Sequence, residues 1–374
     1  MAAGATGVRV VFFGSHKQPS YVVETFISPK KDQLKEGEIL VKILISTICS
    51  SDIHSIDGRR EVKAPCVLGH EGVGEVIFSK RNRDDVRVGD RVAFTMYNSC
   101  QSCVMCKSEM QECCSCATKY GTLSLNDGTG LNGCFATHMV LRARTDVVPV
   151  PLNVSDIIAS PANCALSTMV HAISFASSTT KLKQSVAIIQ GANLMGLYGC
   201  ALLHEAGFIK VFCHDVSRER LRLVPRFGGI PVLVERDYDH NNNHELSGIA
   251  DLIINVCSTW DVIPYALHAL CHRGVYLFVG TTHVEHASIN INVILKKCVT
   301  IKGIEGYQVD HLQKAMEFLS KTVHKYPYEL LTSSPYNLQD FHSAIVCART
   351  KRYYRTAFVG KKKHASYIIC HNYD

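Results

Sequence analysis

The first part of the chain, up to about residue 165, consists of short apolar runs separated by Gly, Pro and Asp, with little helical periodicity. Runs of this kind are typical of β-strands that end in tight turns. Strands are expected at residues 8–13, 38–46, 72–78 and 90–95. This part is therefore predicted to form a β-rich domain.

Near residue 165 the pattern changes to apolar runs that alternate with helical segments. The runs lack polar alternation, which is typical of strands covered on both faces of a parallel sheet. Strands are expected at residues 185–190, 211–214, 251–257 and 275–280. A helix over residues 194–206, ended by Gly207, completes the first βαβ unit. The alternation predicts a doubly wound parallel sheet.

Mixed elements return after about residue 305, including an expected helix at residues 312–321. The predicted fold class is α/β with two domains. Residues 1–165 and 305–374 are predicted to form the β-rich domain, and residues 166–304 an inserted domain with the doubly wound sheet. Residues 98–118, inside the first domain, are rich in cysteine and have no apolar pattern of their own. This lobe would need a metal to hold its shape.

Composition narrows the functional classes. The chain has 374 residues, 47% of them hydrophobic and 20% charged, which is ordinary for a soluble globular protein with two cores. The net charge of +7 is spread along the chain, and its densest cluster, residues 361–363, is interpreted as a solvated tail. The lack of a basic stripe with interleaved aromatics argues against nucleic-acid binding. No uncharged apolar stretch reaches the roughly 18 residues of a membrane helix, so no membrane association is expected.

The seventeen cysteines do not indicate a disulfide scaffold, because such scaffolds are short and secreted and no signal peptide opens this sequence. If six cysteines bind zinc, the others occupy core-like positions such as Cys200, Cys213 and Cys257. Free buried thiols are typical of a reducing compartment. The protein is expected in the cytoplasm.

The lobe carries the strongest metal signal. Tetrahedral zinc needs four soft ligands from a sharply folded loop, and four cysteines have that spacing: Cys100, Cys103, Cys106 and Cys114. Cys113 and Cys116 leave the choice of the fourth ligand open. We predict a closed, structural zinc site here.

A second set of candidate ligands predicts an open zinc site. Cys49, His70 and Cys164 would supply two thiolates and an imidazole, which leaves one position for water or substrate. The two thiolates would cancel the charge of the ion. Glu71 is either a further ligand or a carboxylate behind the ligands, and the sequence does not decide between them.

Residues next to Cys49 suit the remaining tasks. Ser51 could accept the proton of an alcohol and His54 could pass it to solvent. Asp52 could hydrogen-bond the non-ligating nitrogen of His70. Taken singly, Cys49 is more often a buried core thiol and His54 a surface residue. Their combination favours the catalytic interpretation.

The segment after residues 185–190 resembles a nucleotide-binding turn. Gly191 and Gly196 stand where the Gly-x-Gly-x-x-Gly fingerprint needs them, but Asn193 replaces the second glycine. Asn tolerates positive φ better than most residues, so the turn is expected to survive, although the side chain could crowd the pyrophosphate. Asp215 ends the second strand, where an acid receives the ribose hydroxyls. It favours NAD over NADP, whose 2′-phosphate it would repel.

Together these residues resemble the zinc-dependent medium-chain alcohol dehydrogenases, from Val8 to about Gly360. The segment Cys49–His54 resembles the family's first catalytic-zinc segment, Gly69–Gly74 resembles its zinc signature, and the lobe cysteines match its structural zinc. The resemblance implies a GroES-like catalytic domain, a Rossmann NAD(P)-binding domain and two zinc ions per chain. It also implies a homodimer or homotetramer.

Three further features refine the resemblance. Cys164 occupies the position where polyol dehydrogenases of the sorbitol type carry Glu. The sequence therefore resembles those polyol dehydrogenases less than other members of the family. The segment around Arg355 resembles the family's late arginine segment, which approaches the cofactor pyrophosphate. The residues around Pro161 and Lys119 are most similar to alcohol dehydrogenases associated with phosphonate catabolism.

These observations predict an NAD-preferring, zinc-dependent oxidoreductase that interconverts an alcohol and an aldehyde or ketone. One alternative, suggested by Asn193, is a non-catalytic descendant that keeps the fold and the structural zinc as a binding or regulatory protein. A second is a zinc-assisted reductase of activated double bonds, whose members often lack the zinc ligands present here. The partner is a small molecule, whose identity depends on loops that the sequence does not reveal.

Overall fold

The computed structural model describes residues 5–82, 85–179, 185–234, 247–257, 259, 262–280, 286 and 289–360. The chain forms two compact units. The first contains the chain up to Val92, Lys119–Ala143 and the chain from Ser333 onward. The second contains Ala93–Thr118 and Arg144–Thr332. The lysine cluster at residues 361–363 lies outside the described residues.

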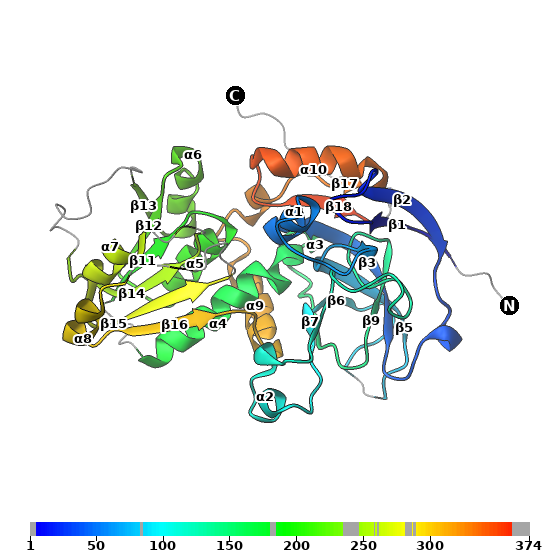
Figure 1. Ribbon diagram of the computed structural model, residues 1–374, viewed down its shortest axis with the longest axis horizontal. Helices are drawn as coiled ribbons and strands as arrows, with labels where there is room; N and C mark the ends of the chain where they lie inside the picture. The colour runs from blue at the N-terminus through cyan, green and yellow to red at the C-terminus, as the bar shows by residue number, and fades with distance from the viewer. Residues whose placement is uncertain are drawn as a thin grey trace. The chain divides into compact units, whose positions relative to one another are not determined.

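The first unit is built on two β-sheets (Figure 1). One has the order β2-β1-β4, and the other contains β6-β5-β3-β18-β17 with β9 paired to β3. Its strands are β1 (Thr6–Phe12), β2 (Tyr21–Ile27), β3 (Ile39–Ile48), β4 (Cys66–Val67), β5 (Glu71–Ser79), β6 (Arg91–Phe94), β9 (His138–Leu141), β17 (Tyr336–Asn337) and β18 (Thr356–Val359). Its helices are η1 (Lys31–Gln33), α1 (Ser50–Ile56), η7 (Leu338–Asp340) and α10 (Phe341–Thr350). The strands predicted from the apolar runs are confirmed, with ends displaced by one or two residues.

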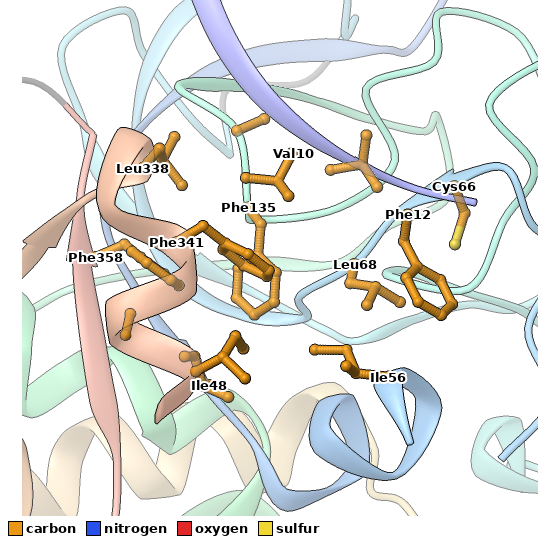
Figure 2. Close-up of a cluster of buried hydrophobic side chains, with 14 residues drawn as sticks. Val10, Phe12, Ile48, Ile56, Cys66, Leu68, Phe135, Leu338, Phe341 and Phe358 are labelled. Atoms are coloured by element: carbon orange, nitrogen blue, oxygen red, sulfur yellow. The ribbon is translucent and has the colours of Figure 1, made fainter. Parts of the chain in front are cut away.

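A cluster of buried apolar side chains stabilises this unit beneath α10 (Figure 2). The rings of Phe341 and Phe358 stack with centroids 5.5 Å apart, and Phe135 meets both edge-on. Ile48, the last residue of β3, and Ile56, the last residue of α1, belong to the same cluster. The core therefore holds both sides of the connection between β3 and α1.

The second unit contains, among its described residues, a six-stranded parallel sheet of order β13-β12-β11-β14-β15-β16. Numbered along the chain this is the order 3-2-1-4-5-6 of dinucleotide-binding folds. The predicted doubly wound sheet is therefore confirmed. The strands are β11 (Val186–Gln190), β12 (Lys210–Asp215), β13 (Ile230–Leu233), β14 (Ala250–Asn255), β15 (Leu270–Val279) and β16 (Thr300–Ile304).

Helices and short elements complete this unit (Figure 1). They are β7 (Tyr97–Asn98), α2 (Val104–Lys107), η2 (Gln111–Cys113), β8 (Thr118–Lys119), β10 (Val147–Pro149), α3 (Asp156–Ala159), η3 (Ser160–Asn163), α4 (Ala165–Thr179), α5 (Leu194–Glu205), η4 (Val224–Phe227), α6 (Arg218–Leu221), α7 (Val262–Ala269), α8 (Ile291–Lys297), α9 (Val309–Thr322) and η6 (Tyr328–Leu331). The structure confirms the helices expected at residues 194–206 and 312–321. Helix α4 packs against both α5 and α9.

The compact units differ in extent from the predicted domains. The cysteine lobe, residues 144–165 and residues 305–332 lie in the same unit as the parallel sheet. Residues 305–332 lie with the sheet because the apolar face of α9 is buried and contacts α4. The apolar residues of this face are spaced three or four positions apart, as expected for a helix covered on one side: Leu312, Ala315, Met316 and Leu319.

The described residues include no single helix that is long and apolar enough to cross a membrane. One helix pair, Asp156–Asn163 with Ala165–Ser177, meets the length and composition requirement together, but it is bent by 56°.

Gly196 lies where α5 approaches the end of β11. A Cβ atom at this position would lie 2.0 Å from the carbonyl oxygen of Gly191. Because this oxygen belongs to the backbone, relieving the clash would require a shift of the main chain. We expect Gly196→Ala to lower the free energy of unfolding by roughly 1–3 kcal/mol, the usual cost of overpacking. This cost outweighs the better helix propensity of Ala, about 1 kcal/mol. Urea unfolding measures the change.

Gly303→Ala is the matched control, because a Cβ atom there would meet no atom within 4 Å. Its stability is expected to stay within about 0.5 kcal/mol of the parent chain. Equal stability of the two variants would contradict the close approach of α5 to β11.

Candidate metal centres and cofactor turn

Three neighbouring strands of the first unit bring polar residues to one edge of a sheet. The register pairs the end of β3 with the start of β5 and with the start of β18. Cys49 directly follows β3, while His70 and Arg355 directly precede the other two strands. The ligand atoms of Cys49, His70 and Glu71 lie within 4.8 Å of one another. The fold thus gathers residues that are far apart in the sequence.

Asp52 connects Cys49 to His70. Cys49 precedes α1, and its backbone N–H donates to Asp52 Oδ2 at 2.9 Å. The other oxygen, Oδ1, lies 3.4 Å from Nδ1 of His70, and both side chains are almost fully buried. This contact directs Nδ1 of the ring towards the carboxylate and leaves Nε2 on the opposite side. A metal ligand is oriented in the same way by a carboxylate behind it.

The surroundings of His70 favour positive charge. Burial lowers the pKa of the imidazole, but Asp52 and the Cys49 thiolate outweigh it and bring the pKa to about 9. A site that stabilises a cation and offers a thiolate and an imidazole suits Zn²⁺. The donor set and the electrostatics of this edge therefore fit a zinc ion.

The Glu71 carboxylate is already engaged by protein groups. Arg355 donates from Nε to Oε2 at 2.7 Å and from Nη2 to Oε1 at 2.8 Å, and Thr47 Oγ1 donates to Oε2 at 2.7 Å. Burial raises the pKa of Glu71 to about 7, while Arg355 opposes the rise. Nη2 of Arg355 also lies 3.7 Å from the sulfur of Cys49. A buried, bidentate pair between an arginine and a carboxylate holds the carboxylate in place.

Ser51 and His54 lie three residues apart on α1 and therefore share one face of the helix. The hydroxyl of Ser51 is buried and has no hydrogen-bond partner among the described residues. His54 is half-buried. The arrangement leaves the Ser51 hydroxyl able to exchange a proton and keeps the imidazole near solvent.

The lobe cysteines in the second unit have the geometry of a zinc site. The sulfurs of Cys100 and Cys106 are 3.9 Å apart, and so are those of Cys103 and Cys114. Zinc–sulfur bonds of about 2.3 Å in a tetrahedron place the sulfurs about 3.8 Å apart. The backbone N–H groups of Cys100 and Cys103 donate to the sulfurs of Cys114 and Cys100, each at 3.3 Å. These sulfurs therefore fit a tetrahedral zinc ion.

The structure distinguishes the candidates for the fourth lobe ligand by burial and position. Cys114 is buried and lies with the other three sulfurs, whereas Cys113 and Cys116 are exposed. Gln101, between Cys100 and Cys103, turns the chain with φ of 58°, a left-handed conformation. Hydrogen bonds from Ser102, together with that from Cys103, lower the pKa of Cys100 to about 5, which favours the thiolate.

Cys164, in the second unit, lies on a tightly held turn between η3 and α4. Its N–H donates to the carbonyl of Pro161 at 3.3 Å, and its carbonyl accepts from Thr168 Oγ1 at 2.8 Å. The position precedes a 15-residue helix. The N-terminal end of a helix stabilises a thiolate.

The cofactor turn keeps its shape despite Asn193, but not by the expected route. Gly191 has φ of 111°, whereas Asn193 has φ of −82° and needs no left-handed conformation. Its Oδ1 accepts from the N–H of Gly196 at 3.1 Å, and its Nδ2 donates to the carbonyl of Val256 at 2.6 Å. The side chain caps α5 and ties the turn to the end of β14.

Asp215 lies at the carboxyl end of β12, as predicted. Its oxygens accept from the N–H groups of Ala192 and Ser217, both at 2.8 Å, and Nη1 of Arg220 lies 3.4 Å from Oδ2. These contacts bring the carboxylate next to the turn that follows β11.

The sequence did not reveal the contacts of Glu71 with Thr47 and Arg355. The partners are separated from Glu71 by 24 and 284 residues. No local pattern connects residues at such distances, and only the register of β5, β3 and β18 places them together.

Comparisons with known proteins bear on both units. The family model for an alcohol dehydrogenase GroES-like domain matches residues 35–152, and that for a zinc-binding dehydrogenase matches residues 195–321. An L-threonine 3-dehydrogenase from Streptomyces avermitilis is 30% identical over 297 residues, which cover 77% of this chain and 82% of that protein.

Solved structures share the fold. An alcohol dehydrogenase from Thermotoga maritima has a TM-score of 0.86 at 23% identity, covering 95% of this chain and 100% of its own. A zinc-binding dehydrogenase from Sinorhizobium meliloti, bound to NADP, has a TM-score of 0.82 at 17% identity, covering 95% of this chain and 99% of its own.

The matches confirm the predicted combination of a GroES-like and a Rossmann domain. Because the curated relatives are dehydrogenases, they also confirm the predicted reaction class, an NAD(P)-linked oxidation or reduction at an alcohol carbon. The chain belongs to the zinc-dependent medium-chain dehydrogenases.

Proposed function

We propose that this protein is an NAD-preferring alcohol dehydrogenase that holds two zinc ions, one in the cysteine lobe and one at the sheet edge. The observation that carries the proposal is the convergence of Cys49 and His70, with Asp52 orienting the imidazole. The sulfur spacing in the lobe supports the structural ion.

Cys49, His70 and Cys164 are the proposed ligands of the catalytic zinc. The two thiolates would balance the charge of the ion. With the imidazole as the third ligand, the fourth position would be available to the substrate oxygen. Glu71 remains bound to Arg355, because ligation of zinc would leave a buried guanidinium without its carboxylate. We therefore place Glu71 behind the ligands rather than among them.

The zinc ion, when bound, supplies a Lewis acid that stabilises negative charge on a substrate oxygen. The protein moves the proton. The Ser51 hydroxyl, buried and without a described partner, accepts the proton of the alcohol, and His54 passes it to solvent.

The turn after β11 is the proposed cofactor site. With the N–H of Gly196 bound to Asn193, the N–H groups of Leu194 and Met195 remain at the start of the 12-residue helix α5 to bind the pyrophosphate. Asp215 receives the ribose hydroxyls of NAD and repels the 2′-phosphate of NADP. The resemblance assigns Arg355 to the pyrophosphate, but its Nε and Nη2 are bound to Glu71 and its Nη1 to the carbonyl of Tyr354, so we propose that it holds Glu71 in place instead.

The similarity to L-threonine 3-dehydrogenases makes L-threonine the first substrate to test, beside a panel of simple primary and secondary alcohols. We further propose a homodimer or homotetramer in the cytoplasm. None of the sixteen cysteines in the described part of the chain forms a disulfide, which supports a reducing compartment. Light scattering on the purified protein measures the oligomeric state.

Zinc content tests both metal sites. We expect two zinc ions per chain by elemental mass spectrometry after a chelator wash, and one in Cys49→Ala. Because the metal contributes several kcal/mol to catalysis, turnover in Cys49→Ala should fall by about 10³-fold or more. The control is Cys298→Ala, an exposed cysteine outside both sets, which should keep two zinc ions and full turnover. Unchanged turnover in Cys49→Ala would refute the proposed function.

Ser51→Ala tests the proton path. Removal of the hydroxyl should lower kcat by roughly 10²- to 10⁴-fold, the usual contribution of general acid–base catalysis, while the zinc content stays at two. The exposed neighbour Ser50 provides the control, since Ser50→Ala should leave kcat unchanged. Equal kcat for the two variants would exclude Ser51 from the proton path.

Asp215→Ser tests the cofactor preference. Repulsion between a carboxylate and a phosphate about 4 Å away is worth roughly 1–4 kcal/mol, so the variant should shift the ratio of kcat/KM for NADP over NAD upward by at least about 5-fold. Asp251→Asn is the control, because this carboxylate binds the N–H of Val186 at the opposite end of β11. A parent enzyme that uses both cofactors equally would contradict the NAD preference.

A further inference from the structure

We propose that Tyr307 is a positioning residue for Cys164, and that Gln308 connects this arrangement to the cysteine lobe. The inference rests on the proposed function, in which Cys164 is a zinc ligand. Residues 306–308 join β16 to α9 and lie, like Cys164 and the lobe, in the second unit.

Tyr307 holds the peptide group that precedes Cys164. Its hydroxyl donates to the carbonyl of Asn163 and accepts from the backbone N–H of Met96 at 3.2 Å, and the side chain is 3% exposed. The amide of Asn163 donates to the carbonyl of Phe94 at 3.0 Å. Because the Asn163 carbonyl belongs to the peptide bond with Cys164, the phenol directly restrains the backbone of Cys164.

The neighbouring Gly306 holds the helix that follows Cys164. Its carbonyl accepts from Nδ1 of His171, on α4, at 3.0 Å. The ring of His171 stacks on that of His311 of α9, with centroids 4.6 Å apart. The turn before Cys164 and the helix after it are therefore both attached to the same connection between β16 and α9.

Gln308 attaches this connection to the lobe. Its Nε2 donates to the carbonyl of Glu109 at 2.5 Å and to Oε2 of Glu112 at 2.8 Å. Both acceptors lie in the chain segment between Cys106 and Cys114. A zinc ion that orders this segment would thereby also order the residues that restrain Cys164.

A metal ligand has to be held within about half an ångström of its productive position, and a lost partner behind a ligand typically weakens metal binding by roughly 10- to 100-fold. The Tyr307 hydroxyl makes the backbone contact, while the ring only fills space. Removing the oxygen alone should therefore weaken the catalytic zinc and leave the packing intact.

The test compares Tyr307→Phe with Tyr328→Phe in the full-length protein. Tyr328 is the matched control, a buried tyrosine of the same unit whose hydroxyl bonds to Thr322 at 2.8 Å. Chelator competition measures the affinity for each zinc ion, and elemental mass spectrometry counts them. In Tyr307→Phe, the affinity of one site should fall roughly 10- to 100-fold while the lobe zinc remains, and Tyr328→Phe should bind both ions normally. Gln308→Ala should weaken the same site.

The outcomes separate this inference from the proposed function. The role of Tyr307 would be overturned if Tyr307→Phe bound two zinc ions tightly or if both of its sites were weakened equally. It would also be overturned if Tyr328→Phe lost as much zinc affinity as Tyr307→Phe. Normal binding in Gln308→Ala would overturn the connection to the lobe. Cys164→Ala provides the reference: if it keeps both ions, the proposed ligand set fails, whereas if it loses one and Tyr307→Phe loses none, only the role of Tyr307 fails.

Discussion

A guanidinium and a carboxylate that are both removed from water have to satisfy each other, and the pair formed by Arg355 and Glu71 does so across three strands. Leaving either charge buried alone costs about 3–5 kcal/mol, so the two residues constrain each other strongly. The pair fixes the start of β18 against the start of β5, on either side of the end of β3 where Cys49 lies. The arrangement of the sheet edge depends on this interaction and on the aromatic cluster beneath it.

The cysteine lobe is stabilised by its sulfurs and their contacts rather than by a hydrophobic core. Its exposed apolar residues, such as Val104 and Met105, face solvent instead of forming a core. Sulfurs spaced for a tetrahedral ion, together with backbone N–H groups directed at them, take the place of hydrophobic packing. Gln308 links the lobe to the rest of its unit. A metal ion bound by these sulfurs would supply the support that a hydrophobic core gives elsewhere.

Asn193 illustrates how a departure from a fingerprint can be accommodated. A glycine at this position allows the pyrophosphate to approach the backbone, and its loss suggested a non-catalytic descendant that keeps the fold. The side chain instead points into the protein, where it caps α5 and bonds to Val256. The main reason for considering a non-catalytic descendant is thereby weakened, because the turn keeps both its shape and its helix N-terminus.

Local patterns in the sequence determined the strands, the helix at residues 194–206, the dinucleotide-binding order of elements and the spacing of the lobe cysteines, because each depends on residues within a few turns of one another. The same local patterns singled out Cys49, His70 and Asp215 as candidates. The tertiary structure alone decided that Glu71 pairs with Arg355, that Cys114 rather than Cys113 or Cys116 joins the lobe sulfurs, and that Tyr307 contacts the residue before Cys164. These choices follow from strand register and helix packing, which bring together residues up to 284 positions apart and leave no trace in the local sequence.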